Sequence, residues 1–60
     1  MEQLVELGKS YTDNITGITG VATAAWIAID APPQAKLEYV DRNGHHADVW
    51  IANTRLKLAN

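Results

Sequence analysis

The chain has 60 residues, five Lys and Arg against seven Asp and Glu, and no cysteine. This length allows one domain, and a core this small usually needs a disulfide, a metal or a partner chain as an additional stabiliser. The absence of cysteine excludes disulfides and thiolate zinc sites, so we expect self-association to supply the stabilisation. A net charge of −2 argues against nucleic acid and anionic membranes as partners, because both bind through phosphate.

The apolar segments indicate neither a membrane span nor an export signal. The longest apolar run extends at most from Ile18 to Ile29, which is too short to cross a bilayer as a helix. The N-terminus, Met1-Glu2-Gln3, lacks the positively charged region that precedes the apolar part of a signal peptide. We therefore expect a complete small gene product that works inside a cell and has no membrane partner.

Two short elements are expected ahead of the apolar run. Residues 2–7 are compatible with a single helical turn or with an edge strand, and Gly8 ends this segment. Residues 10–15 are expected to form the first strand, because they are rich in β-favouring side chains. Gly17 then supplies a turn, since glycine accepts positive φ without steric cost.

The apolar run 18–29 is expected to be the central strand. Its β-branched residues share one face, and its alanines share the other with Trp26. A helix is the alternative, because alanine is the best helix former, but the β-branched residues and the following Pro32-Pro33 favour a strand. We expect this strand to bend near Ala24-Ala25, to bury its branched face and to expose its alanine face. The branched face comprises Val21, Thr23, Ala25, Ile27 and Ile29.

The remaining segments complete an all-β pattern. They are a loop at 30–34, strands at 35–40, 45–51 and 56–58, a hairpin turn at 41–44 and a helical turn at 52–55. The Asp-Arg-Asn-Gly sequence of the hairpin is a strong turn signal. Five strands, of which the second is long and bent, with a helical turn before the last, predict a small closed barrel. We expect residues 1–60 to form this barrel as a single domain, because closure removes exposed sheet edges.

This order of features resembles a five-stranded SH3-like barrel. Leu7-Gly8-Lys9, then Asp13, then Ile-Thr-Gly-Ile-Thr-Gly-Val-Ala-Thr-Ala at 15–24 resembles the turn motif of small, mostly uncharacterised phage and prophage proteins. Residues 50–56 lie where that family has a Trp-containing strand before a short turn and a Leu. The resemblance implies a phage origin and an SH3-like barrel. Looser likenesses are to the KOW element of ribosomal and transcription proteins and to the tetrameric type II dihydrofolate reductases.

Five residues are candidates for binding a partner or a ligand: Trp26, Tyr39, Trp50, Asn53 and Arg55. If the core takes the branched residues, both tryptophans point outward. Exposed large aromatics in a small acidic protein suggest an interface, or a platform on which a nucleotide stacks. The alternative is that one of them caps the end of the barrel. Arg55, close to Asn53 and just before the closing strand, is a candidate for binding phosphate or carboxylate, with a plain salt bridge as the alternative.

Two further patterns have plain explanations. Gly17 and Gly20 resemble an anion-binding nest, but no lysine follows them as a phosphate-binding loop requires, so we expect a turn glycine and a bulge glycine. His45 and His46 point to opposite faces of a strand and cannot chelate one ion together, although Asp48 is placed to make a weak pair with His46. We expect no metal site, no cofactor and no catalytic group.

The leading hypothesis is a non-catalytic, phage-type binding protein. It would act as a homo-oligomer on a host protein or a small nucleotide, including a role against host defence, and nucleic acid is not an expected partner. A second hypothesis is a virion structural protein, such as a capsid decoration or connector protein, because alanine-rich strands and a marginal core suit a lattice. The expected location is therefore the host cytoplasm or the virion. A third hypothesis is a symmetric-pore reductase resembling type II dihydrofolate reductase, whose pore strand Val-Gln-Ile-Tyr is poorly matched by residues 48–51.

Overall fold

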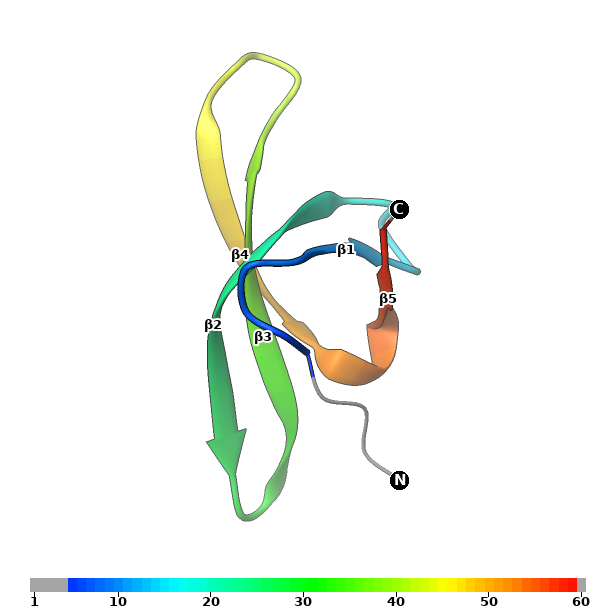
Figure 1. Ribbon diagram of the computed structural model, residues 1–60, viewed down its shortest axis with the longest axis vertical. Coiled ribbons are helices and arrows are strands. Elements are labelled where there is room, and N and C mark those ends of the chain that lie inside the picture. Colours follow the sequence, from blue (N-terminus) through cyan, green and yellow to red (C-terminus); the bar gives the residue numbers. More distant parts are fainter. Residues whose placement is uncertain (1–4, 60) are drawn as a thin grey trace.

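The structure is a computed structural model that describes residues 5–59. These residues form five antiparallel strands in one sheet, with a single 3-10 turn before the last strand (Figure 1). The elements are β1 (Ser10–Asp13), β2 (Thr19–Ala28), β3 (Ala31–Val40), β4 (His46–Ala52), η1 (Asn53–Arg55) and β5 (Leu56–Leu58). The prediction of an all-β, five-stranded SH3-like barrel with a helical turn before its last strand is confirmed. The expected closure is not seen in residues 5–59, because β4 and β5 end the strand order and do not pair with each other. No helix within the described range is long and apolar enough to cross a membrane.

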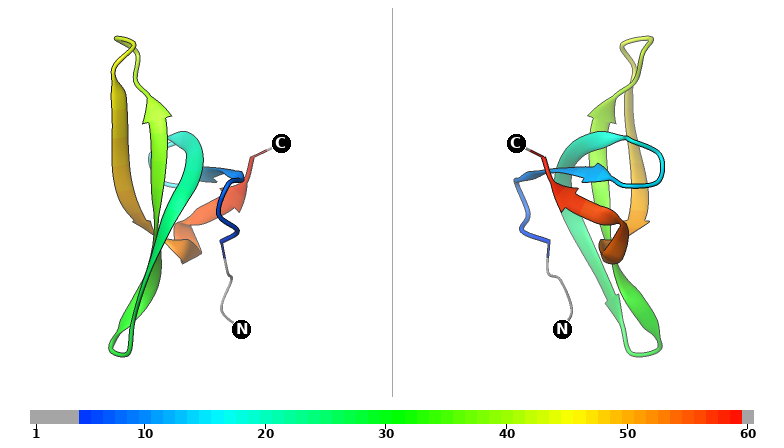
Figure 2. Two further views of the ribbon diagram at one scale, coloured as in Figure 1. Left: turned by 60° about the vertical axis from the view of Figure 1, so that its left-hand side comes forward. Right: turned by 90° about the vertical axis from the view of Figure 1, so that its right-hand side faces the viewer.

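The sheet has the order β4-β3-β2-β1-β5, and β2 connects its two parts. Residues 19–21 of β2 pair with β1, and residues 21–28 pair with β3. Because β2 changes partner along its length, β1 and β5 cross one face of the sheet formed by β2, β3 and β4 (Figures 1 and 2). Of the segment 2–7 expected ahead of β1, residues 2–4 lie outside the described residues, and residues 5–7 belong to no strand.

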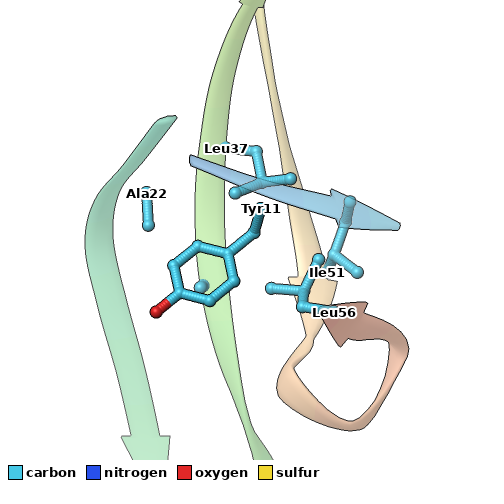
Figure 3. Close-up of a cluster of buried hydrophobic side chains, with 6 residues drawn as sticks. Tyr11, Ala22, Leu37, Ile51 and Leu56 are labelled. Atoms are coloured by element: carbon cyan, nitrogen blue, oxygen red, sulfur yellow. The ribbon is translucent and has the colours of Figure 1, made fainter. Parts of the chain in front are cut away.

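The core lies between β1–β5 and the facing side of β2, β3 and β4 (Figure 3). Its buried apolar side chains are Tyr11, Ala22, Ala35, Leu37, Ile51 and Leu56. Two of the six are alanines, and Leu37 is the largest apolar side chain that is fully buried. The oxygen of Tyr11 accepts the backbone N–H of Glu6 at 2.9 Å, so the one polar atom that Tyr11 brings into this core has a partner. The core is therefore thin, and its buried side chains fill only a small volume.

The predicted orientation of the central strand is wrong. Ala22 is fully buried opposite Leu37, whereas Val21 is exposed, Ile27 is 75% exposed and Ile29 is completely exposed. The branched face therefore points to solvent over most of its length. The physical reason is the path of β2. A β-bulge at Thr23 interrupts the alternation of its side chains, and the end of the β2–β3 hairpin extends beyond β1 and β5, which cover the core (Figure 2).

A β-bulge places the bend in β2. Ala22 pairs with Leu37 and Ala24 pairs with Lys36, so Thr23 is an extra residue in β2 with no opposite residue in β3. A bulge of this kind bends a strand and reverses the alternation of faces beyond it. The bend occurs one residue before the predicted position. As a result, even-numbered residues of β2 lie on one face before Thr23 and on the other face after it.

The loop predicted at 30–34 is wrong, because β3 begins at Ala31 and contains both prolines. The pairing with β2 passes from Ala28 opposite Ala31 to Trp26 opposite Gln34, with an irregularity between them. Proline lacks a backbone N–H but has an extended φ, so it is compatible with a strand where no ladder bond is required from it. The two prolines occupy this irregular part of the β2–β3 hairpin.

Gly20 is the site of a close approach between strands, and it is not the predicted bulge. It lies in regular register opposite Tyr11, and a Cβ added to it would be 2.7 Å from the backbone oxygen of Glu38. Because backbone cannot move aside as a flexible side chain can, we expect Gly20→Ala to destabilise the fold by about 1–3 kcal/mol, as overpacking does. Thermal unfolding followed by circular dichroism measures this. Thr54→Ala, at an exposed position, is the control and should stay within about 0.5 kcal/mol.

Candidate binding face of the sheet

The candidate site lies on the side of β2, β3 and β4 that faces away from the core. Ala35 and Leu37 of β3 are buried in the core, so their neighbours on the strand point to the opposite side. Residues paired across an antiparallel ladder share a side, and the register extends this surface to both neighbouring strands. We call it the outer face; it comprises Val21, Ala24, Trp26, Gln34, Lys36, Glu38, Val40, His46, Asp48 and Trp50.

The two tryptophans meet on the outer face. Trp26 is paired with Gln34 and Trp50 with Lys36, so the indoles stand on either side of β3, displaced by two residues along it. Each tryptophan is 46% exposed. Together with Gln34 they line an open hollow of about 340 Å³, which we call the tryptophan hollow. The outward position predicted for Trp50 is confirmed together with its premise, because Ile51 is buried and Val49 packs against the core. The premise for Trp26 was wrong, and the bulge at Thr23 is what keeps Trp26 on this face.

The tryptophan hollow has a defined chemistry. Indole faces stack on planar groups and attract cations, and the amide of Gln34 both donates and accepts hydrogen bonds. Lys36, directly beside Trp50 in the ladder, is a cation within the same surface. The volume falls at the lower end of the range of roughly 300–1,000 Å³ found for small-ligand pockets. A flat group with a polar edge therefore matches the lining.

The outer face becomes charged toward the β3–β4 hairpin. His46 Nε2 lies 2.8 Å from Glu38 Oε1, and hydrogen bonds from Thr23 and then His46 hold the pKa of Glu38 below its ordinary value. The weak pair expected between His46 and Asp48 is thus replaced by a contact with Glu38. The neighbouring strand brings Glu38 within reach, because Glu38 is paired with Asp48 and lies diagonally opposite His46.

Tyr39 does not belong to the tryptophan hollow. It lies on the same side of β3 as Leu37 and is partly buried. Its Cβ is close to Gly20, at 3.2 Å from where a Cβ on that glycine would lie. The structure therefore separates Tyr39 from Trp26 and Trp50 by the thickness of the sheet, and no single flat surface contains all three aromatics.

η1 places Asn53 in the interior of the fold and Arg55 at its surface, where 40% of the Arg55 side chain is exposed. Asn53 is buried. The guanidinium of Arg55 donates from Nε to Asp13 Oδ1 at 3.0 Å and from Nη2 to Asp13 Oδ2 at 2.6 Å. Of the two alternatives that the sequence left for Arg55, the structure shows the salt bridge. This bidentate contact is the geometry in which a guanidinium and a carboxylate match best.

Asp13 organises the turn after β1; in the sequence it was noted as part of the turn motif but not as a candidate site residue. Its carboxylate is fully buried and also accepts the Thr16 hydroxyl at 2.6 Å and the backbone N–H groups of Ile15 and Thr16 at 3.1 and 3.3 Å. The hydrogen bond from Arg55 is the main cause that holds the pKa of Asp13 well below its usual range. The available signal was Asp13 three residues before Thr16, a spacing typical of a side-chain-stabilised turn.

A second exposed apolar region lies at the end of the β2–β3 hairpin. Ile27 is 75% exposed and Ile29 is completely exposed, and the hairpin extends beyond the crossing of β1 and β5 (Figure 2). These two isoleucines are exposed apolar side chains outside the outer face.

Comparison with known proteins gives no relative from which to transfer a function. No family model matches the sequence, and searches of curated proteins and of solved structures also find no match. Within residues 5–59, no group of three or more His, Cys, Asp or Glu side chains is placed to hold a metal ion.

Proposed function

We propose that this chain is a non-catalytic binding protein of phage type that acts as a homo-oligomer and receives its ligand or partner in the tryptophan hollow. The observation that carries the proposal is the pair of half-exposed indoles on either side of Gln34. Partially exposed tryptophans in a hollow are the residues that most often dominate binding energy at interfaces. The candidates for the occupant are a small nucleotide and a segment of a host protein, with action against host defence as the biological setting.

The small-nucleotide candidate is supported by the lining. A base stacks on an indole regardless of its identity, Gln34 offers a donor and an acceptor to the edge of a base, and Lys36 supplies a positive charge for a phosphate. A protein segment is supported by the exposed Ile27 and Ile29 at the end of the β2–β3 hairpin, which offer an apolar contact separate from the hollow. The homo-oligomer is supported by the thin core, since a 60-residue domain gains much of its stability from a partner chain.

Tryptophan fluorescence tests the proposal directly, because Trp26 and Trp50 are the two tryptophans of the chain. We expect adenosine or guanosine monophosphate to change the emission saturably, and Trp26→Ala or Trp50→Ala each to weaken binding by about tenfold, as the loss of one stacking platform does. Leu58→Ala, an exposed apolar residue on β5, is the control and should bind normally.

The protein-segment candidate is tested by capture from host lysate with the same variants. A specific host protein retained by the wild type and by Leu58→Ala, but not by Trp26→Ala or Trp50→Ala, is the expected result for that partner. If nucleotides leave the emission unchanged and captured proteins do not depend on either tryptophan, the tryptophan hollow is not the binding site.

A further inference from the structure

We propose that β4 is the oligomer contact, and that β4 of one copy pairs antiparallel with β4 of a second copy to make a continuous sheet across a two-fold axis. This inference rests on the homo-oligomer part of the proposed function and names the surface that forms it. The partner is a second copy of this chain. The observations behind it are the position of β4 in the sheet, the direction of its backbone groups and the composition of its edge.

β4 is a long strand with one unpaired side. It stands at the end of the strand order, and Figure 2 shows no other segment of residues 5–59 alongside it on the side away from β3. The other edge strand, β5, has three residues, whereas β4 has seven. A long unpaired edge presents a row of N–H and C=O groups that pairs readily with another strand.

The hairpin bond identifies which backbone groups of β4 point outward. Asp41 donates its N–H to the carbonyl of His45 at 2.9 Å, which makes these two residues a hydrogen-bonded pair. Antiparallel pairs alternate between bonded and non-bonded, so the odd-numbered residues of β4 bond to β3 and the even-numbered residues direct their N–H and C=O groups away from it. The even-numbered residues are His46, Asp48, Trp50 and Ala52.

The edge carries few of the features by which monomeric proteins protect such strands. Natural edges are blunted by proline, lysine, bulges or short length. The sequence of β4, His-Ala-Asp-Val-Trp-Ile-Ala, contains neither proline nor lysine, and its register with β3 is regular from Gln34 to Val40. Asp48 is its single acidic residue, and Trp50 leaves about half of its surface exposed on the same edge.

One register uses the whole strand. Pairing all seven residues places Val49 on the two-fold axis and sets Asp48 opposite Trp50 of the partner subunit. In this register the outward-directed residues of one copy bond to the outward-directed residues of the other, as an antiparallel ladder requires. The side chains of both outer faces then lie on one side of the six central strands, which are β2, β3 and β4 of each copy. The contact is isologous, which is the commonest arrangement of homodimers.

This pairing places both tryptophan hollows on one continuous surface. Trp50 is on the strand that forms the contact and Trp26 is two strands away from it, so each hollow lies beside the two-fold axis and both open in the same direction. Self-pairing also requires no sequence other than that of this chain, because each copy supplies the same donors and acceptors that the other needs. For this reason a second copy, rather than a strand of a different protein, is the proposed occupant of the edge.

A proline at position 48 separates edge pairing from folding. The N–H of Asp48 points away from β3, so Asp48→Pro removes an outward donor without removing a bond to β3. Because the two-fold axis duplicates the loss, we expect the dimer Kd to rise about thirtyfold or more. Asp48→Ala removes the carboxylate and keeps the N–H, and it should remain a dimer. Light scattering after size exclusion should give twice the 6.6 kDa chain mass for the wild type and for Asp48→Ala.

A single cysteine reports the register and does not depend on the proline variant folding. The chain has no cysteine, and a non-bonded antiparallel pair has a Cα separation of about 4.5 Å, which permits a disulfide. We expect Val49→Cys to form a disulfide-linked dimer under mild oxidation about tenfold or more faster than Ile29→Cys, because pairing raises the local thiol concentration. Ile29 is fully exposed, so its variant measures random collision.

The outcomes distinguish this inference from the proposed function. A wild type that is monomeric at micromolar concentration overturns both the β4 contact and the homo-oligomer, while the fluorescence titration of the tryptophan hollow is judged separately. A dimer that persists in folded Asp48→Pro, or a Val49→Cys variant that crosslinks no faster than Ile29→Cys, overturns the β4 contact and leaves the homo-oligomer in place through another surface.

Discussion

Asp13→Asn is expected to leave the chain largely unfolded at 25 °C, and this is the largest effect of any single substitution that we predict. Asn has nearly the same shape, but its amide nitrogen would face donors from Arg55 and Thr16, and its neutral side chain would leave the guanidinium without its counter-charge. The Asp13 carboxylate is fully buried, whereas 40% of the Arg55 side chain is exposed. The loss therefore comes mainly from the buried donors that Asp13 accepts, which would be left without an acceptor. Circular dichroism and a thermal scan measure the loss of the cooperative transition.

Asp13 also makes the stability of the fold depend on pH. The pKa of Asp13 is held well below its usual range in the folded state, mainly by the hydrogen bond from Arg55, while the unfolded chain has the ordinary value of about 3.9. A lowered folded-state pKa contributes stability that is fully present above the ordinary value and is lost as pH falls below it. The melting temperature of the wild type should therefore fall from about pH 5 toward pH 2, with a smaller contribution of the same sign from Glu38.

Asp30→Asn is the matched control for Asp13→Asn. It makes the same chemical change at an exposed position in the turn between β2 and β3. We expect its stability to stay within about 0.5 kcal/mol of the wild type, with an unchanged dependence on pH. If Asp13→Asn melts at the wild-type temperature, or if the melting temperature of the wild type does not fall in acid, then the Asp13–Arg55 pair does not hold the fold together.

Leu37→Ala is expected to cost about 2–5 kcal/mol, the range for a buried leucine that leaves a cavity. The whole stability of 60 residues is of the order of 3–9 kcal/mol, so this variant should be marginally folded or unfolded at 37 °C. Leu37 is fully buried between β1, β2 and β4, and two of its five buried apolar neighbours in the core are alanines. Such a core has few side chains long enough to close the cavity.

Val40→Ala tests whether burial is the cause. It lies on the same strand but on the outer face, where Val40 is exposed, and it should lose less than about 0.5 kcal/mol. Urea unfolding of the two variants gives both free energies. Equal losses in Leu37→Ala and Val40→Ala would mean that the cluster around Leu37 is not the core.

Local signals were sufficient to predict the class of fold and most of its elements. Five runs of β-favouring residues, the Asp-Arg-Asn-Gly turn and the short helical turn ahead of Leu56 all act within a few residues, and their positions agree with β1 to β5 to within a few residues. The start of β3 was missed because Pro32-Pro33 normally ends regular structure. The irregular pairing that accommodates the two prolines depends on a neighbouring strand.

The faces of β2 could not be predicted from alternation alone. Alternation assumes an unbroken strand and cannot locate an extra residue such as Thr23. It also assumes that the most hydrophobic side chains are buried, whereas the structure buries Ala22 and exposes Val21, Ile27 and Ile29. The exposed position of Trp26 thus followed from an incorrect premise, and it is the bulge that gives the residue its place on the outer face.

The candidate site was predicted in part. The two tryptophans lie together because the register of β2, β3 and β4 brings them to one face. The sequence indicated that both side chains point outward, because each alternates with a row of β-branched residues. Gln34 was assigned to a loop and was missed. Arg55 was proposed to bind a ligand because its real partner could not be recognised. Asp13 is 42 residues away in the sequence, and no local pattern reveals a contact over that separation.

The long separation between Asp13 and Arg55 has a consequence for the order of folding. The hairpins β2–β3 and β3–β4 join neighbouring segments, whereas the Asp13–Arg55 pair and the β1–β5 ladder close a loop that includes most of the chain. Closing a long loop carries an entropy cost that short hairpins avoid. We therefore expect the hairpins to form in the transition state and the ion pair to form after it, so weakening that pair should speed unfolding while leaving the refolding rate almost unchanged.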